Sequence, residues 1–225
     1  MFGAAHGLRR TRELRDMSQE SSTAAGDVSR VRLRVWIDFV CPYCLLGKEV
    51  IRAAIEGLAV DIVWMPFELR PYPTPTLRPE DDYLPAAWKQ GVYPTAERMG
   101  IAIRLPSVSP QPYTRKAFLG LQYAVEHGQG EAYVDAVLRA FFQQDRDIGD
   151  TALLKAIIRE LGLDPQGLDA VLASPQYAER HDAALRLARE VGIRAVPSVA
   201  VGDRLFSGTP QPDALRAEIL RQTAS

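Results

Sequence analysis

The chain has 225 residues, of which 47% are hydrophobic and 24% are charged, and a formal net charge of −1 at pH 7. This length is sufficient to bury a core in one large domain or in a domain that carries an insertion. The near-neutral charge argues against a nucleic-acid or anionic-membrane partner, and no apolar run approaches the roughly 20 residues that a membrane-spanning helix needs.

Residues 1–30 are predicted to be a disordered tail. Its second half is rich in Ser, Thr, Ala and Gly, a composition that cannot bury enough apolar surface to fold. Arginines at positions 9, 10, 12 and 15 interrupt the few apolar residues, so the segment does not resemble a secretory signal. We therefore expect a cytoplasmic protein.

Residues 31–44 join a predicted strand to a Cys-Pro-Tyr-Cys motif. From Val31 to Ile37 apolar and other residues alternate, which is the period-two pattern of a strand. After Cys44 the apolar residues recur at helical spacing as far as Leu58. Pro42 fits the first turn of that helix, where a missing N–H group is tolerated. The motif therefore lies where a strand passes into a helix.

Cys41 and Cys44 are the only cysteines of the chain. Cys41 falls at the helix N-terminus, where unpaired N–H groups and the helix dipole favour a thiolate over a thiol. Cys44 lies three residues on, near the same helical face, within reach of a mixed disulfide at Cys41. We predict that Cys41 is the nucleophile and that Cys44 resolves the mixed disulfide.

The alternatives are two buried, inert cysteines or half of a zinc site. A structural zinc site needs four ligands, and the chain offers only three histidines, at distant positions and without a paired spacing. We therefore predict no metal. In a reducing compartment a vicinal cysteine pair is more often catalytic or sensing than structural, which favours the redox interpretation.

Asp61 to Phe67 is predicted to form a second strand, short, apolar and central, with Pro66 near its far end. Residues 68–82 contain four prolines, which excludes a regular helix and indicates a stiff connection into another lobe. In residues 81–111 we expect short helices broken by Gly91, Pro94 and Gly100, followed by an extended segment at residues 101–106.

The rest of the chain is predicted to be a helical block followed by a hairpin and a last helix. Apolar residues at helical spacing recur in five segments, which begin near Tyr113, Tyr133, Asp150, Asp164 and Ser174. Short strands at residues 198–201 and 204–207 flank a Gly-Asp turn, which predicts a hairpin. The final helix carries Leu215, Ile219 and Leu220.

A Cys-x-x-Cys motif at the first strand-to-helix junction, in this order of elements, is the thioredoxin arrangement. More narrowly, the chain resembles the cytoplasmic DsbA-like family that includes the FrnE proteins, related to 2-hydroxychromene-2-carboxylate isomerases and kappa-class glutathione transferases. The matching segments cover residues 33 to about 222 and are DFVCPYC (38–44) with Gly47-Lys48, FELRP (67–71), Phe141-Phe142 with Asp147-Ile148, VGIRAVPS (191–198) and GTPQP (208–212).

The resemblance implies an α/β thioredoxin fold with an all-helical domain inserted after the second strand. The thioredoxin-like domain would comprise residues 31–72 and 175–222, and the insertion residues 73–174. It also implies thiol–disulfide exchange and a cis peptide bond at Val196-Pro197, beside the cysteine pair. Two departures from the family pattern are Pro-Tyr between the cysteines, where many relatives have Pro-Trp, and Ile193-Arg194-Ala195 before the Val-Pro pair.

We expect a redox-active Cys41–Cys44 disulfide, with no other bound cofactor and with glutathione as a candidate reductant. The substrates would be disulfide- or thiol-containing proteins or peptides, paired as an added strand with the backbone of Val196 next to Pro197. Pro42, Tyr43 and Asp38 are candidate modulating residues. For Asp38 the favoured interpretation is a cap of the local turn, and the alternative is a charge that tunes the pair.

Two further functions stay open. One is a glutathione-dependent isomerase or transferase of the same fold family, and the other is a redox-switched binding protein or holdase. His127 and His181, on predicted helices among charged neighbours, are expected to be solvated and are assigned no role. The aromatic residues Trp64, Trp88, Tyr72 and Tyr83 could line a groove between lobes, but packing is the favoured interpretation.

Overall fold

The computed structural model describes residues 30–223 and contains a four-stranded mixed sheet of order β2-β1-β3-β4. The strands are β1 (Val31–Ile37), β2 (Val60–Pro66), β3 (Ser198–Val201) and β4 (Arg204–Ser207). β1 pairs parallel with β2 and antiparallel with β3, so that Val35 lies between Trp64 and Val199, and β4 pairs antiparallel with β3. The α/β thioredoxin-like fold that the sequence predicts is thus confirmed.

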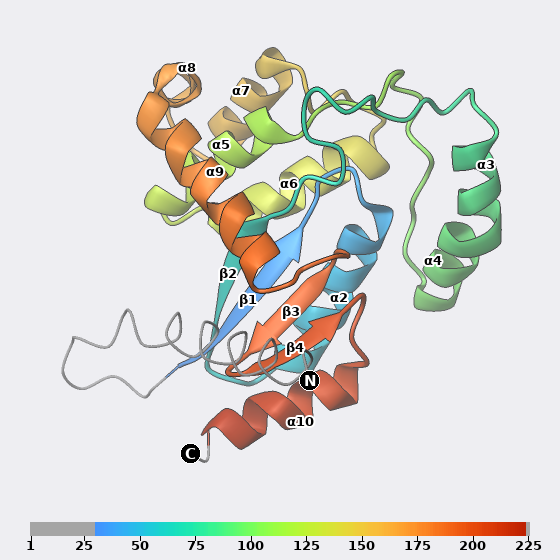
Figure 1. Cartoon of the computed structure of the whole chain (residues 1–225), viewed down its shortest axis with the longest axis vertical. Helices are drawn as coiled ribbons and strands as arrows, with labels where there is room; N and C mark the ends of the chain where they lie inside the picture. The colour runs from blue at the N-terminus through green and yellow to red at the C-terminus, as the bar shows by residue number, and fades with distance from the viewer. Residues whose placement is uncertain (1–29, 224–225) are drawn as a thin grey trace, which may run out of the picture.

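Two helices belong directly to the sheet. α2 (Pro42–Ile55) follows β1, and α10 (Pro212–Thr223) packs against α2, β1 and β3. In Figure 1 α10 lies at the end of the molecule opposite to the helices that precede β3. The predicted disordered tail lies outside the described residues except for Arg30, whose side chain bonds Asp61 Oδ1 at 2.6 Å.

The segment between β2 and β3 is helical, as predicted. Its helices are α3 (Tyr83–Ala87), α4 (Tyr93–Met99), α5 (Arg115–Glu126), α6 (Gly130–Phe142), α7 (Thr151–Glu160), α8 (Pro165–Ala173) and α9 (Pro175–Glu190). α6 and α9 pack against β2, and Lys48 of α2 donates to Asp135 of α6. The insert therefore contacts both a strand and a helix of the sheet layer, and in Figure 1 its helices α5 to α9 gather at one end of the sheet.

Two of the sequence predictions about this region are wrong. β2 is an edge strand and not a central one, which suits Pro66 because a proline cannot donate to a further strand. Residues 83–99 form one continuous helical run, in which a π-helical turn, η1 (Trp88–Val92), joins α3 to α4. Gly91 lies inside this turn, and only Gly100, with φ of 65°, ends the run.

The neighbouring boundaries follow from backbone details. Residues 101–106 form no strand, and Arg104 N–H instead donates to Phe142 at the end of α6. α6 begins at Gly130, three residues before Tyr133. The Asp150 side chain caps α7 by accepting from the N–H of Ala152.

The core lies on both sides of β1. Leu33, Val35, Trp36 and Ile37 are completely buried, since helices or other strands cover both faces. No helix within residues 30–223 is long and apolar enough to cross a membrane. The buried β1 forms a rigid support, and the cysteine motif begins directly after its last residue.

Candidate active site

Cys41 is the N-cap residue of α2, with extended backbone angles and Pro42 behind it in the first turn. Its side chain is 6% exposed, and its thiol donates to the carbonyl oxygen of Val196 at a distance of 3.3 Å. Cys44 lies one turn further on, is 1% exposed and accepts from the backbone N–H of Asp38 at 3.4 Å. Both cysteines are free thiols.

Pro197 lies against the helix that carries the cysteines. The Val196–Pro197 peptide bond is cis, as the resemblance implied. A Cβ atom added to Gly47 of α2 would lie 2.7 Å from Cγ of Pro197, which is closer than real contacts allow. Gly47 therefore lets the proline approach α2, and the carbonyl of the preceding Val196 faces the thiol of Cys41.

The two cysteines have different surroundings. Burial raises the pKa of the Cys44 thiol well above its ordinary value, and the neighbouring Cys41 and the charge of Asp38 raise it further. Cys44 therefore stays protonated unless a base removes its proton. Cys41, by contrast, lies on the wall of a cavity and at the start of a helix.

Asp38 follows β1 directly and is 1% exposed. Its Oδ2 accepts from the backbone N–H of Leu69, at 2.7 Å, in the connection after β2. Burial raises the pKa of Asp38 to about 7, and the hydrogen bond from Leu69 opposes this effect. A hydrogen bond from the backbone of Val40, two residues on, agrees with the interpretation of Asp38 as a cap of the local turn. The bond from Leu69 also ties β1 to the next connection, and the carboxyl group titrates near neutral pH.

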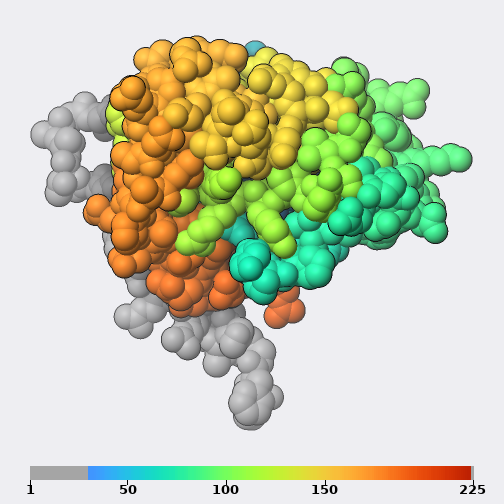
Figure 2. Space-filling model, turned by 90° about the horizontal axis from the view of Figure 1, so that it is seen from above, coloured from blue at the N-terminus to red at the C-terminus, as the bar shows by residue number. Residues whose placement is uncertain are grey.

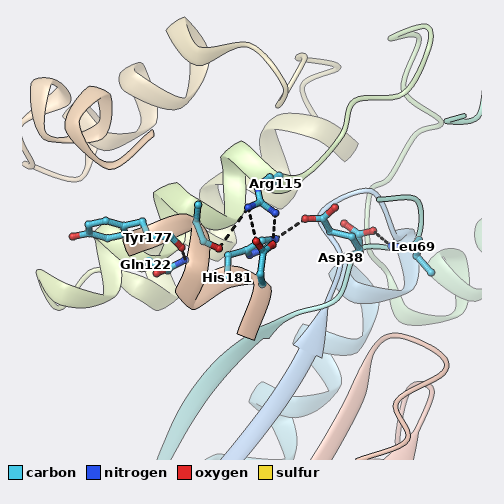
Figure 3. Close-up of polar contacts among 9 residues, drawn as sticks. Asp38, Leu69, Arg115, Gln122, Tyr177 and His181 are labelled. Carbon is cyan, nitrogen blue, oxygen red and sulfur yellow. Dashed lines mark hydrogen bonds and ion pairs between the residues drawn. The ribbon is translucent and has the colours of Figure 1, made fainter. Parts of the chain in front are cut away.

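A second buried pair lies close to Asp38. His181 of α9 is 1% exposed, and its Nε2 lies 2.5 Å from Oε1 of Glu68. The imidazole stacks on Phe118 with ring centroids 5.6 Å apart. Figure 3 shows His181 and Arg115 on one side of this cluster and Asp38 and Leu69 on the other. The expectation of a solvated His181 is wrong, whereas His127 is exposed as expected.

Sequence reasoning missed the Glu68–His181 pair because its members are 113 positions apart. Only the fold brings the connection after β2 against α9. One feature of the sequence could have indicated the pair. Glu68, in the FELRP segment, directly precedes Leu69, whose N–H donates to Asp38. Nearby, Arg115 of α5 binds Asp182 of α9 at 2.6 Å and holds the two helices together (Figure 3).

A cavity of about 230 Å³ lies beside Cys41. One wall consists of residues at the β1–α2 junction, which are Asp38, Val40, Cys41, Pro42 and Tyr43. The facing wall comes from the insert and its connection and includes Leu77, Tyr83, Leu84, Ala87, Trp88 and Val92. Seen from above, the insert hides nearly all of the blue β1–α2 segment (Figure 2).

Tyr43 links the cysteine motif to this facing wall. A Cβ atom added to Gly91 would lie 2.6 Å from the hydroxyl oxygen of Tyr43, so the ring reaches the π-helical turn η1. Trp88 of the same turn is 2% exposed and packs on Phe142. Trp64 is also buried, whereas Tyr72 and Tyr83 are 79% and 63% exposed.

The packing interpretation therefore holds for the two tryptophans, and Tyr83 and Trp88 also line the cavity. Across the described part of the chain, no cluster of three or more histidine, cysteine, aspartate or glutamate side chains could hold a metal ion. The groups around Cys41 and Cys44 are suited to exchange of protons and disulfide bonds.

The model of the DSBA-like thioredoxin domain family matches residues 32–220. The chain belongs to this family. It is 39% identical over 194 residues to the uncharacterized protein YwbO of Bacillus subtilis (strain 168), which covers 84% of this chain and 96% of YwbO. The family is one of thiol–disulfide oxidoreductases with a Cys-x-x-Cys pair, which is Cys41 and Cys44 in this member.

Several solved structures have a similar fold. A probable DsbA oxidoreductase, SCO1869, from Streptomyces coelicolor has a TM-score of 0.70 at 25% identity, over 87% of this chain and 91% of its own. A 2-hydroxychromene-2-carboxylate isomerase has a TM-score of 0.70 at 19% identity, and the match covers 85% of this chain and 96% of the isomerase chain. The cytosolic disulfide reductase DsbM from Pseudomonas aeruginosa, solved with GSH, has a TM-score of 0.66 at 19% identity. The match covers 87% of this chain and 100% of the DsbM chain.

Proposed function

We propose that this DSBA-family protein catalyses thiol–disulfide exchange with Cys41 and Cys44, by way of a mixed disulfide at Cys41. The observation that carries this proposal is the placement of Cys41. It lies at the N-terminus of α2, on a cavity wall, with its thiol on the carbonyl oxygen of Val196. Cys44 lies one helical turn behind it.

In the proposed cycle the Cys41 thiolate attacks a substrate disulfide and releases one thiol. The Val196 carbonyl oxygen, which accepts from the Cys41 thiol in the resting enzyme, then becomes free to accept from a substrate N–H. Pro197, held against Gly47, keeps this carbonyl in place. A peptide substrate would thus pair with Val196 as an added strand.

Resolution of the mixed disulfide requires a thiolate at Cys44, whose pKa is raised by burial. The backbone N–H of Asp38 donates to Cys44 Sγ, and the carboxyl group of the same residue has a pKa of about 7, which is suited to taking up a proton at neutral pH. We therefore assign Asp38 the role of proton acceptor for Cys44. Pro42 and Tyr43, between the cysteines, complete the set of modulating residues.

The finer family placement is also part of the proposal. The DFVCPYC, FELRP and VGIRAVPS segments support a FrnE-type member of the family. The division into residues 31–72 with 175–222 and an insertion at 73–174 agrees with the helical segment between β2 and β3. α9 packs on both β2 and α5, so it would join the two units.

Glutathione is the proposed reductant, supported by the similar fold of DsbM, which was solved with GSH. A cytoplasmic location belongs to the proposal because the glutathione pool of that compartment would return the pair to the dithiol form. Peptides and small molecules that carry disulfides are then the candidate substrates.

The test is reduction of a model disulfide by glutathione with the protein at a small fraction of the substrate concentration. Many turnovers per protein molecule are expected, and none from the Cys41→Ser variant. A single turnover would indicate a redox-switched binding protein instead. Full activity of Cys41→Ser would contradict the assignment.

A further inference from the structure

The cavity beside Cys41 suggests which part of a substrate enters the site. Cys41 is only 6% exposed and lines the cavity, so a reacting sulfur reaches it through the cavity. The insert supplies the facing wall with Leu84, Trp88 and Val92, which are 6%, 2% and 3% exposed. The space next to the nucleophile is thus narrow and apolar.

The size of the cavity limits the occupant. Its volume is about 230 Å³, whereas pockets for drug-sized ligands measure roughly 300 to 1,000 Å³. In another protein, an apolar cavity of about 150 Å³ holds benzene. The space beside Cys41 therefore fits one aromatic ring with a methylene and a sulfur.

The charged groups around the cavity have opposite signs. Asp38 lies in the inner wall, and the exposed Arg70 also lines the cavity, so the lining carries no net charge that would attract a charged ligand. Leu69 and Tyr83, which are 45% and 63% exposed, lie at the rim and present apolar surface to an incoming group. Both features favour a neutral, apolar substituent on the reacting sulfur.

We propose that the site acts on small disulfides and thiols whose sulfur carries a neutral aromatic or similarly bulky apolar group, which occupies the cavity between Tyr43 and the α3–η1 wall. This inference rests on the proposed function. It specifies the substrate class and places the selecting surface on the insert.

Cys41 attacks one sulfur of R–S–S–R, the Cys41–S–R bond forms, and the first R–S⁻ leaves. Cys44 then attacks the Cys41 sulfur, the Cys41–Cys44 bond forms, and the second R–S⁻ leaves. The two thiol protons of the protein end on two R–SH molecules, and two electrons pass to the substrate. A low-molecular-weight thiol such as glutathione reduces the protein again.

The test uses the Cys44→Ser variant, which retains the mixed disulfide at Cys41. It is equilibrated with benzyl mercaptan and 2-mercaptoethanol, two alkyl thiols of similar acidity, at equal concentrations and together with the symmetrical disulfide of each, which supplies the oxidising equivalents. The two adducts are quantified by intact mass. Because burial of an aromatic ring is worth about 1.5–3 kcal/mol, the benzyl adduct is expected to be favoured by about tenfold or more. The same preference is expected in the rate at which the two symmetrical disulfides oxidise the wild-type dithiol.

Two adjacent alanines of α3 provide a matched pair of variants. Ala87 lines the cavity, whereas Ala86 is exposed and does not. Ala87→Phe fills the cavity and is expected to reduce the benzyl preference to about one, and Ala86→Phe is expected to leave it unchanged. These substitutions are made in both the Cys44→Ser and the wild-type background.

The outcomes separate this inference from the proposed function. Equal amounts of the two adducts, or equal effects of Ala86→Phe and Ala87→Phe, would overturn the substrate class while leaving the exchange chemistry intact. Failure of Cys41 to form an adduct with either thiol, together with a wild-type protein that neither disulfide oxidises, would overturn the proposed function itself.

Discussion

The β1–α2 junction is built from residues that are close together in the sequence, whereas the interior behind it is built from residues of distant segments. At the junction Asp38, Cys41 and Cys44 lie within one short stretch, and the start of α2 places the two thiols one turn apart. Behind it, the Leu69 N–H, Glu68 and His181 come from the connection after β2 and from α9. The junction supplies the reacting sulfurs, and the interior sets the burial and the proton affinity of the groups beside them.

The largest effect is expected at the junction. Cys41→Ser removes the attacking sulfur, so catalytic disulfide reduction should fall to the uncatalysed background. The control is Cys44→Ser, which should still form a mixed disulfide once and then stop. If both variants turned over alike, the division of roles between the two cysteines would be wrong.

A change in the interior is expected to act on stability. His181→Asn removes the partner of Glu68 and leaves a buried carboxyl group without its hydrogen bond, which should lower the free energy of unfolding by about 3–5 kcal/mol. Urea denaturation measures this difference. The control is Lys155→Ala, which breaks an ion pair with Asp169 on the surface and should cost about 1 kcal/mol or less. Similar losses in the two variants would mean that the Glu68–His181 pair is not a buried support.

Asp38 joins the two regions, and its effect depends on pH. Its pKa is raised to about 7 in the folded protein, so the unfolded chain loses this proton at a lower pH than the folded one. The folded state therefore becomes less stable as the pH rises from about 4 to about 7, by an amount on the order of 4 kcal/mol.

Asp38→Asn cannot ionise, so its stability relative to the wild type should rise over this pH range and level off above it. The free energy of unfolding at pH 4, 6 and 8 measures the trend. The same variant should lose the pH dependence near 7 in the rate at which Cys44 resolves a mixed disulfide. An unchanged pH profile would remove Asp38 as the proton acceptor.

The smallest losses of stability are expected when a methyl group is added at Gly47 or Gly91, each of which lies close to another side chain. In Gly47→Ala the new Cβ meets Cγ of Pro197, part of a stiff ring, and the loss of stability should be about 1–3 kcal/mol. In Gly91→Ala it meets the hydroxyl end of Tyr43, which can move, so the loss should stay below about 1 kcal/mol. Thermal unfolding of both variants tests this order, and the reverse order would contradict the described packing.

The junction could be predicted from the sequence because its determinants are local. Alternation along β1, Pro42 in the first helical turn and the spacing of Cys41 and Cys44 all act within a few residues. The hairpin of β3 and β4 and the cap at Asp150 follow from equally local signals.

The parts that were missed depend on distant segments. The sequence indicates the local cap at Asp38 but does not show that Leu69 also donates to its carboxylate. His181 was interpreted as solvated because its helix has charged neighbours, while Glu68 and Phe118 enclose it in the fold. Gly91 suggests a helix break, but the backbone absorbs it in a π-helical turn against Tyr43.

The most direct test of the central claim is the redox equilibrium of the cysteine pair in glutathione buffers of varied ratio. The fraction of free Cys41 and Cys44 is measured after acid quenching, by alkylation and intact mass. The proposed function predicts a reversible two-electron transition between the dithiol and an intramolecular Cys41–Cys44 disulfide in the wild-type protein. The Asp38→Asn variant should show the same transition. The Cys44→Ser variant should instead form a stable glutathione adduct. A pair that stays reduced in every buffer, or that stops at a glutathione adduct in the wild-type protein, would contradict it.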